Sequence, residues 1–506
     1  MTLFFAIAAL FIMALGVRIY GAADHPVEFQ YVRQYHSALL ARHFYYQGLE
    51  SVPEWKKAVI GVTTPKIHEP PVMEWLAALG YHAMDGEQLW IPRIIASLFW
   101  IIGSLALLAI LKRFFDTEVA LLSSAFYLLV PYGIYLSRSF QPDSLMAMMM
   151  LLSILTIVRF YEKSSMKRLV TAAGLSSLAL LIKPVAAFLI FGAFISLALS
   201  RKHLKKIIFD RPFWLFCLIT VAPAAVYYLY QVAGGRSLSG VAQKSILPGL
   251  LVHLFYYKGW LYQLERVVGF PFFIAGLIGI LMFNNREGRF MAWGLWLGYL
   301  CFGLVFTWPF TTHAYYHIVA IPIIALCLGP LFEIIIKCLR RQSSWFVRPA
   351  FLGILVFIIA LTLKPVIESI QRNDYMKKAS VFKEIGDTVR HSTKTVFLSP
   401  HEGEPLMYQG WLGGKKWPGS WAFRLEKFGY IRMTDFQELN RQANMQAVKR
   451  RFEEDFKSDK PEYFIVTDFK EFEQQPDLKA FLTTNFDKLA ETNHYIIFDL
   501  RSEKRL

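Results

Sequence analysis

The feature that most constrains the fold is a series of long apolar segments separated by short polar stretches. After a first apolar segment at 1–15, the others lie at about 89–111, 118–137, 143–160, 169–182, 184–200, 212–233, 268–283, 290–310, 314–336 and 349–365. A helix needs about 20 apolar residues to cross the bilayer core. The chain is 55% hydrophobic and only 18% charged, which is unusual for a soluble domain. We therefore predict a mainly α, polytopic transmembrane protein with about eleven spans.

Basic residues gather in alternate connections between these segments and so predict the orientation. The basic connections are Lys112-Arg113, Arg159 to Arg168, Arg201 to Lys206, Arg286 to Arg289, and Lys337 to Arg348. The positive-inside rule places this set in the cytoplasm. The N-terminus is then cytoplasmic, and residues 21–88 and the chain from about 367 lie outside the cell (inner) membrane. The net charge of +16 belongs to the apolar part, so nucleic acid is not an expected partner.

Two domains follow from this threading. Residues 1–366 form the predicted transmembrane domain, in which the outer loop 21–88 carries interfacial helices, because apolar residues recur at helical spacing from Phe29 to Phe44. Residues 367–506 form a predicted extracytoplasmic α/β domain. Its predicted strands are 394–398, 463–467 and 495–500, and its predicted helices are 436–456 and 476–489.

Two local features refine the membrane part. The first apolar segment has no basic residues before it, so we predict a retained span rather than a cleaved signal peptide. Lys183-Pro184 interrupts the apolar stretch 169–200, which predicts two short segments with Lys183 at their outer turn. Interrupted segments of this kind often border sites in membrane proteins.

Three carboxylates on the predicted outer side are candidate catalytic residues: Asp24 and Glu28 in the first loop, and Asp143 at the mouth of a span. A carboxylate there can act as a general base toward an acceptor hydroxyl or amine. The competing interpretation is structural. Asp24 caps a helix, and Glu28 and Asp143 are first-turn acids that follow Pro26 and Pro142.

Outer-side cations and an aromatic turn complete the candidate set. Lys183, Arg93 and Arg138 can hold a phosphate group, although long cationic side chains also reach the interface without any function. Residues 311–317 contain His313, Tyr315, Tyr316 and His317, which fit an aromatic belt. The spacing of the two histidines also allows a metal ligand pair, but no carboxylate stands at a suitable spacing, so we predict no metal and no cofactor.

The chemistry expected on this face is limited by what is available there. The sequence contains no Walker A loop, no glycine-rich dinucleotide loop and no nucleophile elbow. Nucleotide sugars are not available outside the cytoplasm in quantity. A lipid-carried substrate is therefore expected, in a cavity between spans and interfacial helices.

In order and sidedness these motifs resemble membrane glycosyltransferases of the GT-C type, in the group of protein O-mannosyltransferases and the lipid A aminoarabinose transferase. The matching stretches cover residues 1–340 and are Pro26-Val27-Glu28, Glu69-Pro70-Pro71 with Trp75, Pro142 to Leu145, Lys183-Pro184, and His313 to Tyr316 with Pro322. The resemblance implies a GT-C fold and an inverting transfer of a sugar from a polyprenyl-phosphate donor to an acceptor, which is a protein, a lipid or a polysaccharide.

The resemblance also implies residue roles. Glu28 or the displaced Asp24 takes the proton from the acceptor, Asp143 positions acceptor or donor, and His313, Tyr315 and Tyr316 line the phosphate end. The family's Lys before Pro is replaced here by Glu69, so Lys66, Arg93 or Lys183 supplies the charge for the donor phosphate. The rival interpretations are a transporter or lipid flippase without transferase activity, and a non-catalytic assembly or receptor subunit that binds through its outer tail.

Overall fold

The computed structural model describes residues 2–24, 29–67, 69–234, 245–344, 346–371, 374–418, 448, 452 and 460–503. These residues form two compact units. The helical unit contains residues 1–24, 66–76 and 88–372, and the sheet unit contains residues 25–65, 77–87 and 373–506. Most of the opening loop is thus grouped with the tail, while the predicted domains 1–366 and 367–506 stay predictions.

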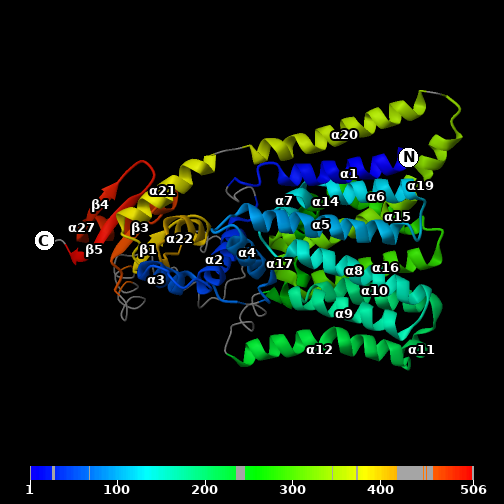
Figure 1. Cartoon of the computed structure of the whole chain (residues 1–506), viewed down its shortest axis with the longest axis horizontal. Helices are drawn as coiled ribbons and strands as arrows, with labels where there is room; N and C mark the ends of the chain where they lie inside the picture. Colours follow the sequence, from blue (N-terminus) through cyan, green and yellow to red (C-terminus); the bar gives the residue numbers. More distant parts are fainter. Residues whose placement is uncertain are drawn as a thin grey trace. The chain divides into compact units, whose positions relative to one another are not determined.

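The helical unit consists of long apolar helices, followed in Figure 1 from the blue N-terminus to the yellow-green α20. Its elements are α1 (Thr2–Ile19), α5 (Trp90–Leu111), α6 (Thr117–Leu129), α7 (Pro131–Ser137), α8 (Asp143–Glu162), α9 (Met166–Ile182), α10 (Ala186–Arg201), α11 (Leu204–Ile208), α12 (Arg211–Ala233), η1 (Pro248–Val252), α14 (Leu254–Val268), α15 (Phe270–Leu281), α16 (Arg286–Val305), α17 (Thr307–Thr312), η2 (Ala314–Val319), α18 (Ala320–Cys327), α19 (Gly329–Arg341) and α20 (Val347–Ile370).

The described helices confirm a multi-pass membrane protein and give a smaller number of clear spans than predicted. Six helical stretches are long and apolar enough to cross a membrane, or up to eight if each of two bent pairs is one span. The bent pairs are α6 with α7, at 62°, and α14 with α15, at 95°. Two shorter apolar helices, Phe5–Ile19 and Ala186–Arg201, add to these. The figure of about eleven spans stays a prediction.

Glycine allows a close helix contact in this unit, between α10 and α16. A Cβ at Gly192 would clash with the backbone of Gly294, and one at Gly298 would clash with the backbone of Phe188. Small residues let membrane helices approach to backbone contact, which lipid-embedded helices need because apolar surface alone does not drive their association. This pair therefore forms a tightly fixed part of the helical unit.

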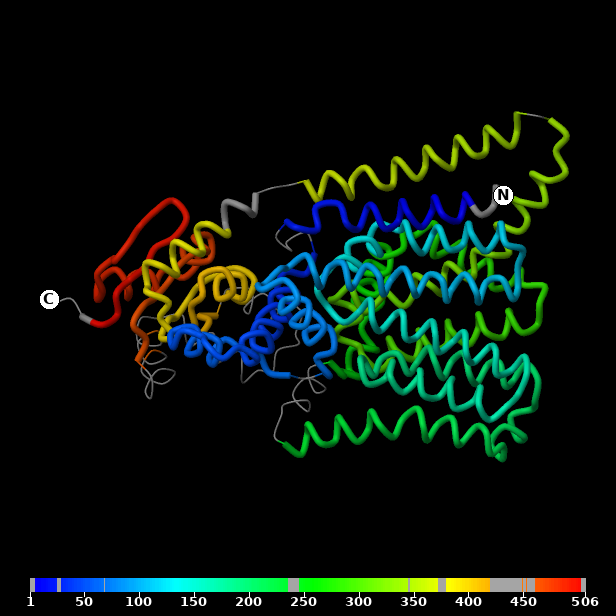
Figure 2. Tube along the Cα trace, in the orientation of Figure 1, coloured from blue at the N-terminus to red at the C-terminus, as the bar shows by residue number. Residues whose placement is uncertain are grey.

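The sheet unit combines a five-stranded mixed sheet with surrounding helices, and Figure 2 traces its chain. Its elements are α2 (Tyr31–Gln47), α3 (Glu54–Thr63), the second part of α4 (Val72–Ala83), α21 (Asp374–Thr388), β1 (Thr395–Leu398), η3 (His401–Gly403), α22 (Glu404–Gly410), β2 (Gly414–Lys416), β3 (Tyr463–Val466), α26 (Phe469–Glu473), α27 (Pro476–Asn485), β4 (Phe486–Glu491) and β5 (Ile496–Glu503).

The sheet has the strand order β2-β1-β3-β5-β4 and a core on both faces. β1 runs parallel to β2 and β3, while β5 runs antiparallel to β3 and β4. Side chains alternate along each strand. Val396 of β1 faces a cluster that includes residues of α26 and α27, and Phe397 faces a cluster that includes residues of α21 and α22. This explains why the central strands are apolar without interruption.

The predicted secondary structure of the tail is confirmed in its strands and wrong in one helix end. β1, β3 and β5 lie within or largely over the three predicted strands. The predicted helix 476–489 ends at Asn485, because Phe486–Glu491 instead pairs with β5 at the sheet edge. The predicted helix 436–456 lies outside the described residues except for Val448 and Phe452.

Polar contacts bind α2 to α22 within the sheet unit. The Arg42 Nε donates to both carboxylate oxygens of Glu87, at 3.1 and 2.9 Å. The Tyr408 hydroxyl donates to Glu87 at 2.7 Å, and Arg42 Nη1 donates to the Tyr408 carbonyl at 2.9 Å. A second pair joins His36 Nδ1 to Glu404 Oε1 at 3.3 Å. The predicted helix in the opening loop is therefore confirmed, and its inner face is buried against protein; its predicted location in the membrane interface stays a prediction.

Candidate active site

A buried ion pair between Asp143 and Lys183 forms the centre of the candidate site. Asp143 is the first residue of α8, and Lys183 lies in the break between α9 and α10. Lys183 Nζ donates to Asp143 Oδ2 at 2.8 Å, and the two side chains are only 8% and 3% exposed. Placing two charges out of water carries a cost of several kcal/mol per ion, so this pair needs a structural or functional reason.

The position of each partner follows from its local sequence. Pro142 precedes α8, so the helix starts at Asp143, where an acid interacts favourably with the helix N-terminus. Pro184 cannot continue α9 and leaves Lys183 in an extended conformation at its end. The predicted break at Lys183-Pro184 is thus confirmed. The start of α8 and the end of α9 therefore bring the carboxylate and the ammonium to one place.

An aromatic cluster from η2 lies beside this pair. Lys183 Nζ is 5.8 Å from the centre of the Tyr315 ring. Tyr315 packs against Tyr316 at 4.9 Å and against His313 at 5.4 Å, measured between ring centroids. His313 Nδ1 lies 2.6 Å from the Thr312 hydroxyl. The structure therefore brings together Asp143, Lys183 and Tyr315 from among the predicted site residues, with His313 and Tyr316 behind Tyr315.

Arg93 lies in a second cluster, where it holds the start of the opening loop. Its guanidinium donates to the carbonyl oxygens of Arg138, Gly21, Ala22 and Asp24 at 3.2, 3.3, 2.9 and 2.7 Å. Arg93 is 1% exposed. These contacts give Arg93 a positioning role toward the segment that leads to Glu28. Its part in binding a donor phosphate stays a prediction.

Positive charge dominates the buried groups of this region. Arg93, Arg138 and Lys183 are at most 6% exposed, and Asp143 is 2% exposed. A Cβ at Gly21 would lie 2.8 Å from Asp24 Oδ2 and 3.7 Å from Arg138 Nη2, so these two groups flank the same turn. Buried guanidinium and ammonium groups suit phosphate oxygens, which accept several charge-assisted hydrogen bonds.

Two predicted residues are not brought into these clusters by the described structure. Glu28 lies outside the described residues. Lys66 is exposed, and within the described ranges no contact joins it to Asp143 or Lys183.

Two further groups near the ion pair were not predicted. The Tyr132 hydroxyl lies close enough to Arg266, Asp143 and Tyr315 to interact with them electrostatically. Arg266 donates to the Gln263 side chain at 3.2 Å, and Gln263 donates to the Thr311 carbonyl at 3.2 Å. Arg266 is a cation just before the apolar segment 268–283, which is a sequence signal that applies to it as well as to Arg93.

His317 has a structural role. Its Nδ1 lies 2.6 Å from the Tyr299 hydroxyl, its Nε2 lies 2.9 Å from the Phe310 carbonyl oxygen, and the ring is fully buried. Both ring nitrogens are therefore occupied. This arrangement fits the aromatic packing interpretation of residues 311–317 and not the pairing of His317 with His313 around a metal.

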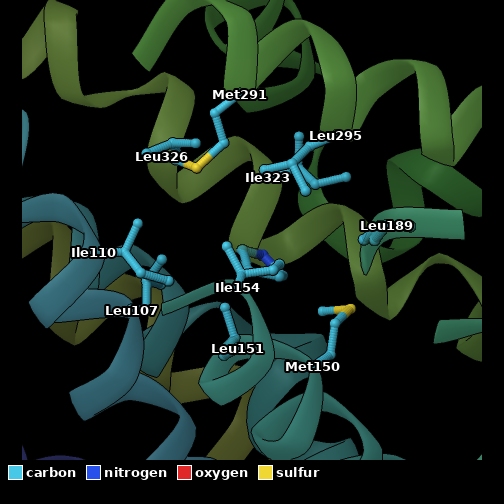
Figure 3. Close-up of a pocket in the computed structure, with 11 residues that line it drawn as sticks. Leu107, Ile110, Met150, Leu151, Ile154, Leu189, Met291, Leu295, Ile323 and Leu326 are labelled. Carbon is cyan, nitrogen blue, oxygen red and sulfur yellow. The ribbon is translucent and has the colours of Figure 1, made fainter. Parts of the chain in front are cut away.

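An apolar pocket inside the helical unit is separate in chemistry from this site (Figure 3). Its lining comes from α5, α8, α10, α16 and α18 and consists of Leu107, Ile110, Met150, Leu151, Ile154, Leu189, Met291, Leu295, Pro322, Ile323 and Leu326. These side chains offer no charged or hydrogen-bonding group. The pocket therefore supplies no acid, base or cation.

A protein-family model matches the part of this chain that contains Arg93, Asp143 and Lys183. The family described as "Dolichyl-phosphate-mannose-protein mannosyltransferase" matches residues 68–227, which include Arg93, Asp143 and Lys183. The "Putative mannosyltransferase YycA" of Bacillus subtilis is 29% identical over 146 residues, or 28% of this chain. The matched part is 21% of that relative's length.

Solved structures share the fold at low sequence identity. ArnT from Cupriavidus metallidurans in the apo state has a TM-score of 0.57 at 14% identity, with 97% of each chain covered. The oligosaccharyltransferase of Archaeoglobus fulgidus has a TM-score of 0.56 at 12% identity, covering 95% of this chain and 73% of its own. In family match and in fold, this chain therefore resembles the membrane glycosyltransferases of the GT-C type, as its motifs predicted.

Proposed function

We propose that this protein is an inverting glycosyltransferase that moves a sugar from a polyprenyl-phosphate donor to an acceptor at the outer face of the membrane. The observation that carries the proposal is the buried Asp143–Lys183 pair at the junction of three helices, with Tyr315 beside it. ArnT from Cupriavidus metallidurans has been solved bound to undecaprenyl phosphate, and the Archaeoglobus oligosaccharyltransferase with a dolichol-phosphate. A donor of the same chemical class suits the buried cations here.

The geometry supports a division of labour between the two partners of the pair. Lys183 carries three N–H donors, and among the described residues its ammonium hydrogen-bonds only to Asp143. Two donors thus remain for phosphate oxygens. Asp143 holds the ammonium in position, and its carboxylate can also accept a hydrogen bond from a sugar or acceptor hydroxyl.

The reaction we assign is a single displacement at the anomeric carbon. Glu28, or Asp24, takes the proton from the acceptor hydroxyl or amine as the new bond to the anomeric carbon forms. The bond from that carbon to the phosphate oxygen breaks, and polyprenyl phosphate leaves with the electron pair. Lys183 stabilises the negative charge on the leaving phosphate, and Arg93, Lys66 and the newly identified Arg266 are further candidates for this task. Charge stabilisation away from water is expected to be the largest single contribution.

The proposal includes a topology. The N-terminus is cytoplasmic, about eleven segments cross the cell membrane, and residues 367–506 form an extracytoplasmic domain. The turns that carry Asp143 and Lys183 then face outward, where polyprenyl-phosphate sugars are the available donors.

The test is release of polyprenyl phosphate by the purified full-length protein from a panel of polyprenyl-phosphate sugars, with a panel of acceptors. Parent protein is expected to turn over at least one donor, and Glu28→Gln is expected to abolish transfer while it keeps donor binding. Glu50→Gln provides the matched control, because Glu50 is an exposed acid of the same loop.

Each outcome decides something. Transfer that survives in Glu28→Gln but is lost in Asp24→Asn moves the base to Asp24. No turnover of any donor by folded protein, with donor carried across vesicle membranes instead, would overturn the proposal in favour of a flippase. Unchanged transfer in Asp143→Asn would remove the ion pair from the mechanism.

A further inference from the structure

A group of aromatic side chains in the sheet unit, of which Trp55 is exposed and Tyr46 and Trp411 are half-buried, is not used by the proposed chemistry. We call Tyr46, Trp55 and Trp411, together with Lys56, the aromatic platform. Trp55 belongs to the first turn of α3 and is 41% exposed. One face of its indole stacks on the His391 ring at 4.2 Å and 14°. Since that face is covered, the exposed area of Trp55 lies on the rest of the ring.

His391 is held as a rigid support for Trp55. Its Nδ1 lies 3.2 and 3.1 Å from the carbonyl oxygens of Gly410 and Trp411. Its Nε2 lies 3.5 Å from Asp387. These contacts hold the His391 ring in place against the covered face of the Trp55 indole.

Trp411 adopts a backbone conformation that a bulky residue rarely takes. It follows α22 with φ of +50°, in the left-handed region that glycine normally occupies at this position. The Arg42 guanidinium lies 3.7 Å from the centre of the Trp411 ring. Tyr46 and Trp55 meet Trp411 edge to face at 5.5 and 5.8 Å. Strain of this kind persists where the surroundings require it and is frequent at binding sites.

Lys56 places a cation among the three rings. Its Nζ is 4.9, 5.2 and 5.7 Å from the ring centres of Trp411, Tyr46 and Trp55. It donates to the Tyr46 hydroxyl at 3.4 Å and makes no ion pair within the described part of the chain. Burial and the neighbouring Glu87, to which the Tyr46 hydroxyl hydrogen-bonds, raise the pKa of Tyr46 to about 12. The platform therefore combines aromatic rings with one ammonium donor, Lys56.

Simple packing explains only part of this arrangement. The buried Arg42 and Tyr408 join α2 to α22 and need no ligand. Packing does not require an indole that is 41% exposed on a rigid support, nor a cation left without a carboxylate beside it. An exposed indole with one face covered, next to a cationic donor, suits a pyranose, which presents C–H groups to an aromatic ring and hydroxyls at its edge.

We propose that the aromatic platform binds the sugar rings of a saccharide chain, which is the acceptor of the transfer reaction. Trp55 stacks on a sugar ring beside Trp411, and Lys56 donates to hydroxyl or acidic groups of the chain. The assignment as acceptor rests on the proposed glycosyltransferase function, whereas saccharide binding itself does not. This narrows the acceptor from protein, lipid or polysaccharide to a molecule that carries a saccharide.

A lipid surface is the less favoured occupant. Interfacial aromatics need no rigid support, because they partition as single side chains. The first turn of α3 also carries Glu54 and Lys57, which are 87% and 51% exposed and paired with each other at 2.7 Å. Such a charged turn beside Trp55 opposes burial of the platform in acyl chains.

The test is saccharide binding by full-length protein in detergent, followed by tryptophan fluorescence and equilibrium dialysis with neutral and acidic oligosaccharides. Trp55→Ala is expected to weaken binding about 10-fold, the size of a lost aromatic contact. Lys56→Ala should weaken the acidic ligands more than the neutral ones. Trp293→Ala is the matched control, since Trp293 is 53% exposed in the helical unit and outside the platform.

The transferase assay then separates the two proposals. Trp55→Ala is expected to raise KM for the acceptor and to leave donor binding and the melting temperature unchanged. The proposal that the platform binds saccharides is overturned if the protein binds no oligosaccharide, or if parent and Trp55→Ala bind equally, even when sugar transfer is intact. Binding to anionic vesicles in place of oligosaccharides would assign the surface to lipid. Saccharide binding without any donor turnover would support the aromatic platform as a saccharide site and would contradict only the proposed glycosyltransferase function.

Discussion

Two buried ion pairs, one in each unit, differ in how completely they are satisfied. In the sheet unit, Arg42 donates to both oxygens of Glu87, the Tyr408 hydroxyl adds a further bond, and the guanidinium lies 3.8 and 3.7 Å from the ring centres of Tyr408 and Trp411. In the helical unit, Lys183 makes one hydrogen bond to Asp143, and the Tyr315 ring is 5.8 Å away.

The difference separates a structural ion pair from an ion pair that has hydrogen-bond donors left for a ligand. A buried ion pair stabilises a fold only when further hydrogen bonds satisfy its remaining donors and acceptors. The Arg42–Glu87 pair meets that condition and has little left to offer a ligand. The Asp143–Lys183 pair does not meet it within the described structure, and an incompletely satisfied buried charge is typical of a binding site.

The largest effect is expected from breaking the helical-unit pair. Lys183→Met should lower the rate of sugar transfer about 100-fold or more, as expected for the loss of one preorganised charge donor. The Asp143→Asn, Lys183→Met double variant should regain folded protein, because no uncompensated charge is left, but should not regain activity. Steady-state transfer kinetics and thermal melting measure the two quantities.

A matched control comes from an exposed pair in the same unit. Lys337 and Glu333 are 2.8 Å apart with side chains 55% and 31% exposed, so Lys337→Met should change little. Recovery of transfer in the double variant would show that Asp143 and Lys183 form only a structural pair.

The second effect concerns the Arg42–Glu87 pair of the sheet unit. Glu87→Gln leaves the buried Arg42 guanidinium without a counter-charge, which is expected to destabilise the sheet unit by about 3 kcal/mol. Hydrogen exchange in α2 and α22 reports this loss locally, while turnover of the polyprenyl-phosphate donor should change little. A large loss of donor turnover with unchanged hydrogen exchange would contradict this prediction. It would show that Arg42–Glu87, and not Asp143–Lys183, is the functional pair.

The smallest effect is a pH dependence at the second contact between α2 and α22. Burial raises the pKa of the Glu404 carboxyl, and the neighbouring His36 opposes the rise. A raised pKa means that the folded state favours the protonated acid. The contribution of Glu404 to the free energy of unfolding is therefore at its full size below the unfolded pKa of about 4.5. It is lost as the pH rises through the pKa of the folded state.

Glu404→Gln removes this titration while it keeps the shape of the side chain. We expect local opening of α22, measured by hydrogen exchange corrected for intrinsic rates, to lose most of its dependence on acidic pH. The resulting change in the free energy of opening of α22 should stay below about 1 kcal/mol, the net contribution of one hydrogen bond. Glu402 and Arg33 also act on Glu404, so an unchanged pH profile in Glu404→Gln would assign the dependence to one of them or to His36.

The sequence predicted the parts of the fold that depend on local pattern. Apolar length marked the membrane helices, Pro184 marked the break before α10, and short β-branched runs marked β1, β3 and β5. It did not predict β4, because residues 486–491 join the sheet only by pairing with β5, a contact that no local pattern encodes. For the same reason it did not predict that the opening loop forms one unit with the tail.

The candidate site divides in a similar way. Asp143 and Lys183 were predictable because Pro142 marks a helix start at Asp143 and Pro184 marks a helix end at Lys183. That they touch depends on the packing of α8 beside α9 and α10, which their spacing of 40 residues does not reveal. Arg93 was predicted as a cation near a span end, but its four carbonyl partners become visible only in three dimensions.

The glycine contact between α10 and α16 has a consequence for how the reaction proceeds. Backbones that meet without side chains between them cannot slide past one another, because every displacement brings a larger residue into the gap. α10 begins three residues after Lys183, so the ammonium lies close in sequence to a tightly packed helix pair of the helical unit. In the reaction we propose, the donor phosphate would therefore come to an ammonium that the helix packing holds in place, and motion during turnover would belong to the lipid carrier and the segments that admit it.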